Sequence, residues 1–161
     1  TTSADLNPDR RLHATGGQAR SLYVELTRNL STRTKPDGGA LAGIVERFVS
    51  AALTEAKGAN ETPEIAIHRK LENLSEMVSG YDFAAVIAAY WKGFDQNNEQ
   101  LKSDAIRWLR GEFSTKTDAL AALGVRTIVD DATMYDQLKL FARFVRLAGL
   151  PHRGHVMPRQ A

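Results

Sequence analysis

Residues 81–94 read YDFAAVIAAYWKGF, the most aromatic and most continuously apolar helical pattern in this chain. Phe83, Ile87 and Tyr90 follow one another at the four- and three-residue spacing of a single helix face. Alanines occupy most of the remaining positions, so the segment is apolar nearly all round. A helix of this kind is buried. We therefore expect the central helix of an all-α fold here, with Asp82 as its N-cap.

The segments before this helix carry amphipathic helical patterns with recognisable ends. Residues 41–58 show a wide apolar stripe, and Gly58 stands where a glycine usually ends a helix. Thr62 and Pro63 are typical of a helix start, because threonine caps and proline suits the first helical position. An apolar repeat then predicts one helix that continues to Gly80. The residues of this repeat are Ile67, Leu71, Leu74 and Val78.

Three further helices are expected after the central one. The first covers residues 101–113, and the second covers residues 118–123 and ends at a glycine. The last begins at Asp130 or Asp131 and ends before Gly149. Its predicted apolar seam consists of Met134, Leu138, Phe141, Val145 and Ala148.

Two segments carry an alternation that is typical of strands. In residues 18–30 apolar side chains fall at helical spacing, but Leu22, Val24 and Leu26 also alternate. We favour a helix there, because the helical pattern runs further than the alternation. Residues 125–129 alternate as well, which predicts a short β-like bridge.

The polar ends of the chain flank a single predicted domain. We expect a flexible N-terminal arm over residues 1–16, a compact bundle of six or seven helices over residues 17–149, and a short basic C-terminal tail over residues 150–161. A chain of 161 residues has the usual size of one domain. Its apolar content of 43% and its net charge of +2 are typical of a globular protein.

Composition also excludes several classes of protein. The absence of cysteine excludes a disulfide scaffold, a thiolate zinc site and a cysteine nucleophile. No stretch approaches the ~18 apolar residues of a membrane span, and the first residues show no signal peptide. We therefore expect a cytoplasmic or otherwise intracellular protein with no membrane contact.

Motifs of the major enzyme classes are missing from the sequence. It holds no Walker A loop, no Gly-x-Gly-x-x-Gly, no Gly-x-Ser-x-Gly and no His-Glu-x-x-His. His152 and His155 alone do not fill a tetrahedral metal site. His68 lies between Glu64 and Glu72 at helical spacing, which is typical of a surface ion pair. We expect no catalytic residue, no metal and no cofactor, and thus a protein that is not an enzyme.

Basic residues gather toward the two ends of the chain, whereas most acidic residues lie in the middle. Lys139, Arg143 and Arg146 are spaced four and three apart, so on a helix they form one stripe that can face a row of phosphates. The alternative is a solvated face whose cations stabilise the helix C-terminus. The candidate nucleic-acid-binding residues are Arg10, Arg11, Arg20, Arg28, Arg33, Lys35, Lys139, Arg143, Arg146 and Arg153.

These features favour a non-enzymatic nucleic-acid-binding or packaging protein that contacts the phosphate backbone through its basic ends and can polymerise along it. They do not distinguish DNA from RNA. The alternative is a helical assembly module that self-associates or binds a protein partner and makes no contact with nucleic acid. A third hypothesis is an enzyme or small-ligand binder with a pocket around Tyr90, Trp91 and Trp108.

Overall fold

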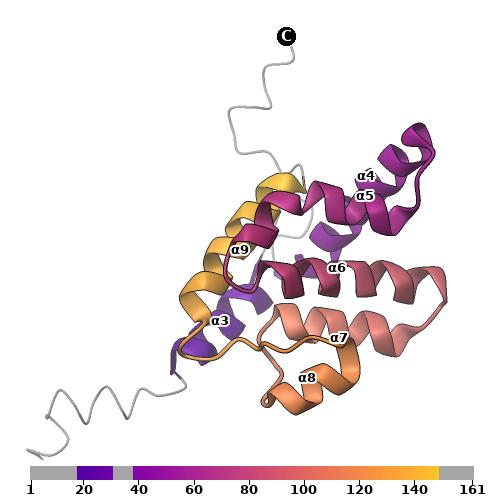
Figure 1. The fold of residues 1–161 in the computed structure, drawn as a ribbon. Helices are drawn as coiled ribbons and strands as arrows, with labels where there is room; N and C mark the ends of the chain where they lie inside the picture. The colour runs from indigo at the N-terminus through magenta and orange to yellow at the C-terminus, as the bar shows by residue number, and fades with distance from the viewer. Residues whose placement is uncertain (1–17, 31–37, 149–161) are drawn as a thin grey trace, which may run out of the picture.

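The computed structural model describes residues 18–30 and 38–148. The predicted arm (1–16) and the predicted tail (150–161) lie outside the described residues. Those described form seven α-helices, one 3-10 helix and no strand, which confirms the all-α prediction (Figure 1). The elements are α3 (Gln18–Arg28), α4 (Leu41–Ala59), α5 (Pro63–Lys70), η1 (Glu72–Glu76), α6 (Gly80–Asp95), α7 (Glu99–Leu109), α8 (Lys116–Leu123) and α9 (Met134–Leu147).

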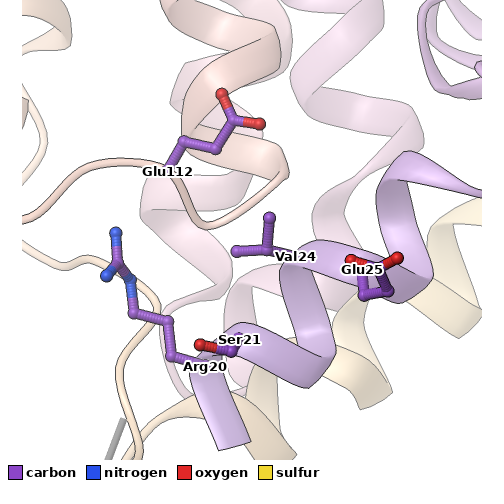
Figure 2. A pocket seen from close by; sticks show the side chains of 5 residues that line it. All are labelled: Arg20, Ser21, Val24, Glu25 and Glu112. Carbon is purple, nitrogen blue, oxygen red and sulfur yellow. The ribbon is translucent and has the colours of Figure 1, made fainter. Parts of the chain in front are cut away.

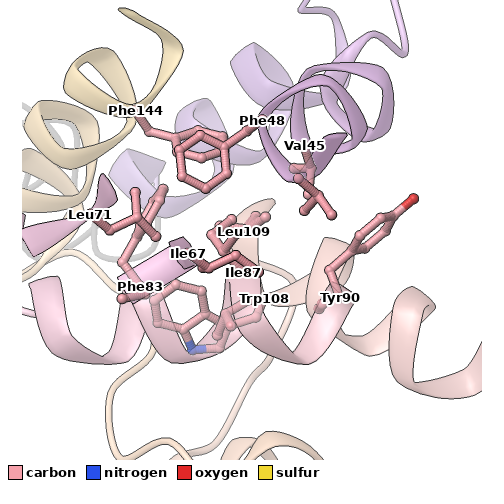
Figure 3. Close-up of a cluster of buried hydrophobic side chains, with 14 of the residues drawn as sticks. Val45, Phe48, Ile67, Leu71, Phe83, Ile87, Tyr90, Trp108, Leu109 and Phe144 are labelled. Atoms are coloured by element: carbon pink, nitrogen blue, oxygen red, sulfur yellow. The ribbon is translucent and has the colours of Figure 1, made fainter. Parts of the chain in front are cut away.

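The central helix is α6, as its apolar composition predicts. It runs through the middle of the bundle, between α4 and α5 on one side and α7 on the other (Figure 1). The ring of Phe83 on α6 lies 6.3 Å from that of Trp108 and 5.3 Å from that of Phe144. Phe144 in turn lies 5.0 Å from Phe48. These contacts join α4, α6, α7 and α9 in one hydrophobic core (Figure 3).

The ends of α4 and α5 test the capping predictions. The hydroxyl oxygen of Thr62 accepts a hydrogen bond of 3.3 Å from the backbone N–H three residues on, and Pro63 is the first residue of α5, as predicted. Gly58, by contrast, lies inside α4 and does not end it. Asn60 is the C-cap instead, with a left-handed φ of 57°. Asparagine tolerates this conformation better than most residues with a side chain, and so replaced the expected glycine.

The helix predicted to run from Pro63 to Gly80 is interrupted. It ends at Lys70 and the chain continues as η1, so Val78 is 60% exposed instead of buried. The chain turns sharply here to bring α6 back against α5. At Gly80 a Cβ atom would stand 1.6 Å from the carbonyl oxygen of Leu74. A continuous helix cannot make this turn, and only glycine fits at its tightest point.

The predicted N-cap of α6 and the predicted bridge are both wrong, and for one reason. Asp82 lies within α6, which begins two residues earlier at Gly80. Its Oδ2 accepts hydrogen bonds from the backbone N–H of Arg126 at 3.1 Å and from Thr127 Oγ1 at 2.8 Å. Residues 125–129 are therefore tied to α6 by a side chain and form no strand.

The last helix, α9, packs on the core with a face that only partly matches the predicted seam: Phe141 and Ala148 are buried as predicted. Leu140 and Phe144 are fully buried, whereas Leu138 and Val145 of the predicted seam are only half-buried. Packing decides this orientation, because Phe144 fits between the rings of Phe48 and Phe83.

The first described helix, α3, confirms the helical interpretation of residues 18–30 and lies beside α9 (Figure 1). Its inward face is small: only Tyr23 and Thr27 are buried. Leu22 and Leu26 are 56% and 51% exposed, although helical spacing alone suggests that they face the core. Apolar burial therefore contributes less to the position of α3 than it does for the helices of the core.

Candidate functional site

Polar contacts fix α3 to the turn that follows α7. The Arg20 guanidinium donates through Nε to the carbonyl oxygen of Gly111 at 2.9 Å and through a terminal nitrogen to that of Phe113 at 3.1 Å. The Arg20 backbone N–H donates to Asp131 Oδ1 at 3.1 Å. One arginine thus holds the start of α3 against two loops that are distant in sequence.

Two more contacts continue this line along α3. The Tyr23 hydroxyl donates to the carbonyl oxygen of Leu109 at 2.7 Å, and the Arg28 guanidinium pairs with Glu112 Oε2 at 2.8 Å. Burial raises the pKa of Tyr23, so its hydroxyl keeps the proton that this bond requires. We call these three α3 residues and their partners at 109–113 the α3 clamp.

A hollow of about 360 Å³, open to solvent, lies beside the clamp (Figure 2). Four of its lining residues come from α3, and Glu112 comes from the segment after α7. Arg20 and Glu112 already bind carbonyl oxygens and Arg28, respectively. The charges around this hollow therefore serve contacts within the protein, and they do not converge on a ligand.

The outer face of α9 carries the cations predicted from spacing. Lys139, Arg143 and Arg146 are all exposed and stand on one side of the helix. The ammonium of Lys139 lies 4.7 Å from the ring centroid of Tyr135, whose side chain is 67% exposed. We call Tyr135 and the three cations the α9 stripe.

The predicted nucleic-acid-binding residues are thus not one surface. Arg20 and Arg28 turn toward the 109–113 segment and are engaged there, so they do not join the α9 stripe. Among the predicted residues that the structure describes, the three cations of α9 form one exposed group. The remaining candidates lie outside the described residues and stay predictions: Arg10, Arg11, Arg33, Lys35 and Arg153.

The aromatic residues of the hypothetical ligand pocket are core residues. Trp108 is 1% exposed and its Nε1 donates to the carbonyl oxygen of Thr127 at 2.7 Å. Tyr90 is 4% exposed and donates to Glu46 Oε2 at 2.8 Å. Burial, followed by the bond to Glu46, raises the pKa of Tyr90. Trp91 is half-buried and packs against the same core. These polar atoms are used in holding the fold.

The carboxylate of Asp130 supports the fold, whereas His68 lies at the surface. Asp130 Oδ1 accepts the backbone N–H groups of Ala132 and Thr133, which shapes the turn before α9. His68 is exposed near the end of α5, and Glu72 belongs to η1 and not to the same helix. Within residues 18–30 and 38–148, no group of three or more acids and histidines could hold a metal ion.

Sequence reasoning missed two residues of these surfaces. Tyr135 lies four residues before Lys139, and that spacing was the available signal for its place on the stripe. Glu112 gave no such signal, because its partner Arg28 is 84 residues away in sequence. Only the packing of α3 against the end of α7 brings that pair together.

Comparison with known proteins identifies the family. No curated protein and no solved structure matches the chain. Within the described ranges, no helix combines the length and the apolar content needed to cross a membrane. Residues 1–157 match the family described as BREX system ATP-binding protein BrxC/D. A family of ATP-binding proteins is not one of non-enzymatic packaging proteins, so the function favoured from the sequence is wrong. Because the match spans nearly all 161 residues, this chain belongs to the BREX system ATP-binding protein BrxC/D family.

Proposed function

We propose that this chain is a helical body of an ATP-dependent BREX protein, and that the nucleotide state acts on it through the α3 clamp. The family match over residues 1–157 carries the proposal of ATP dependence. It also replaces the expectation of a protein with no enzymatic role, since the family is described as ATP-binding. The contacts of α3 suggest where the bundle responds.

The α3 clamp has the properties of an element that can move. It consists of hydrogen bonds and one ion pair, whereas α4, α6 and α9 share a continuous aromatic core. Breaking the partly exposed Arg20 and Arg28 contacts costs little, because water replaces the lost partners, and the buried Tyr23 bond carries the larger share of the cost. Leu22 and Leu26, at 56% and 51% exposed, can gain burial when α3 shifts. The clamped and the shifted positions of α3 therefore need to differ in free energy by only a few kcal/mol. A nucleotide that binds more tightly to one of them can supply this difference.

Hydrogen–deuterium exchange with and without Mg-ATP tests this proposal in the protein as the cell makes it. We expect exchange in α3 and in residues 109–113 to change on ATP addition, while the buried helices α4 and α6 keep theirs. Exchange that is the same in every peptide of this chain at saturating ATP contradicts the proposal.

Two arginine variants provide the matched comparison. Arg20→Met removes the donors to Gly111 and Phe113, so α3 should exchange fast even without nucleotide. Arg47→Met removes an exposed arginine from α4 and should leave α3 unchanged. A variant at Arg20 that exchanges like the parent protein shows that the clamp does not control α3.

We also propose that the partner of this chain is another component of the BREX system. The family description names a system, which supports a protein partner without identifying it.

A further inference from the structure

We propose that the α9 stripe is a docking surface for an acidic helical segment of a protein partner. This inference rests on the exposed side chains of α9 and does not depend on the α3 clamp. It assigns the stripe a kind of partner that the family description does not specify.

The first observation is that the three cations of the stripe stand apart from the ion pairs of the protein. Five described cations elsewhere each have a carboxylate within 4.0 Å: Arg28, Arg69, Lys70, Lys102 and Arg107. No described carboxylate forms an ion pair with Lys139, Arg143 or Arg146. The stripe therefore presents three exposed cations on one helix face, none of them in an ion pair with a described carboxylate.

The second observation is the geometry of the stripe. At 1.5 Å per residue, Lys139 and Arg146 are ~10 Å apart along the helix axis, with Arg143 between them. Acidic side chains at positions i, i+4 and i+7 of a partner helix have the same spacing. Each arginine can also take a carboxylate through two parallel N–H···O bonds. Charge complementarity along one helix face thus favours a partner helix with acidic side chains at this spacing.

The third observation is the aromatic end of the stripe. Tyr135 is 67% exposed, and the Lys139 ammonium lies over its ring. Tyrosine and arginine are the residue types that most often dominate the binding energy of protein interfaces. The support beneath them is firm, because Leu140 and Phe144 anchor the opposite face of α9 in the core.

Charge distribution favours a protein partner over nucleic acid. The stripe is short, and Asp136 stands in the first turn of the same helix, where it repels phosphates. A partner helix with acidic side chains opposite the arginines and a basic side chain opposite Asp136 complements the charges at both ends of α9. A continuous phosphate backbone complements only the arginines.

Binding of defined probes tests the proposal with the whole chain. The probes are a fluorescent helical peptide with glutamate at i, i+4 and i+7, the same peptide with glutamine, and a 20-nucleotide single-stranded DNA. We expect the glutamate peptide alone to raise the anisotropy at low salt. Arg143→Gln with Arg146→Gln should weaken it by about 10-fold or more, the loss typical of hot-spot residues.

The control is Arg47→Gln with Lys57→Gln, which removes the same charge from exposed positions on α4. It should bind as the parent protein does, and thermal melting checks that all variants fold. Equal weakening in the two double variants shows a general charge effect and overturns the proposal. Tighter binding of DNA than of the glutamate peptide, lost with Arg143 and Arg146, also overturns it and assigns the stripe to polyanions. Absence of binding by every probe overturns it as well.

Discussion

The hydroxyl of Tyr23 donates a hydrogen bond of 2.7 Å to the carbonyl oxygen of Leu109 and so joins α3 to the last residue of α7. Both residues are fully buried. This bond lies between the Arg20 and Arg28 contacts of the clamp. It is the part of the clamp that water does not reach, and therefore the part that contributes most to the position of α3.

Removal of the Tyr23 hydroxyl tests its contribution. Tyr23→Phe leaves the ring in place but leaves the Leu109 carbonyl without this donor. We expect the free energy of unfolding to fall by about 1–2 kcal/mol in urea titrations. Tyr135→Phe removes a hydroxyl from an exposed side chain and should leave stability unchanged. Equal stability of the Tyr23 variant and the parent protein contradicts the assigned role.

The close approach at Gly80 predicts a severe effect of a single methyl group. In Gly80→Ala the new Cβ meets the Leu74 carbonyl at 1.6 Å, so the turn between η1 and α6 must open. We expect a loss of ~3 kcal/mol or more, in the range of the most damaging single substitutions. Gly43→Ala is the control, because nothing lies within 4 Å of its Cβ.

In contrast to Gly80→Ala, the control Gly43→Ala should raise the stability of the fold. Gly43 lies inside α4, where alanine is favoured over glycine by up to ~1 kcal/mol. Chemical denaturation measures both changes. A Gly80→Ala protein with parent stability contradicts the described turn.

The tie between α6 and residues 125–129 depends on one carboxylate. Asp82→Ala removes the acceptor of the Arg126 backbone N–H and of the Thr127 hydroxyl. We expect a loss of about 1–3 kcal/mol and faster hydrogen exchange of the Arg126 amide. Asp95→Ala, at the exposed C-terminal end of α6, should change neither. Unaltered exchange at Arg126 in the Asp82 variant shows that this bond does not hold the segment.

The ion pairs between α4 and α5 predict a change in stability at acid pH. Hydrogen bonding to Lys70 lowers the pKa of Glu55. Slight burial opposes this shift, and Arg69 adds to it. A lowered folded-state pKa stabilises the fold above the unfolded value of about 4.3, and this contribution is lost as the pH falls through the folded value. Because Glu55 is 41% exposed, the effect should be only ~0.2–1 kcal/mol.

Melting temperatures measured from about pH 6 down to about pH 2 report this effect as the slope of the melting temperature against pH. Glu55→Gln should flatten the acid decline relative to the parent protein, whereas Glu76→Gln, an exposed change on η1, should not. An unchanged decline in the Glu55 variant contradicts the ion-pair assignment.

The sequence was sufficient for the features that depend on near neighbours. Thr62 and Pro63 start α5 because capping involves only the next few residues. The face of α6 around Phe83 and Ile87 is buried because the helix is apolar on every side. Such local signals predicted the fold class and the α9 stripe's three cations.

The features that sequence reasoning missed depend on contacts between distant segments. Asp82 looked like a cap, but its partners are 44 and 45 residues away. Arg20 and Arg28 looked like free cations until packing placed them against residues 109–113. Periodicity also placed Leu22 and Leu26 inward, whereas the clamp turns them out. No sequence motif indicated ATP, because these residues hold neither a Walker A loop nor a Gly-x-Gly-x-x-Gly sequence.

The distance between α3 and α8 in the presence of ATP tests the central claim most directly. These 161 residues contain no cysteine, so Ser21→Cys and Thr117→Cys place two spin labels at exposed sites on these helices, and no other thiol of this segment competes with them. Pulsed electron paramagnetic resonance then gives the distance distribution in the protein as the cell makes it. We predict one narrow distribution without nucleotide and a shifted or second one with Mg-ATP. Identical distributions in the two states contradict the proposal that ATP acts through the α3 clamp.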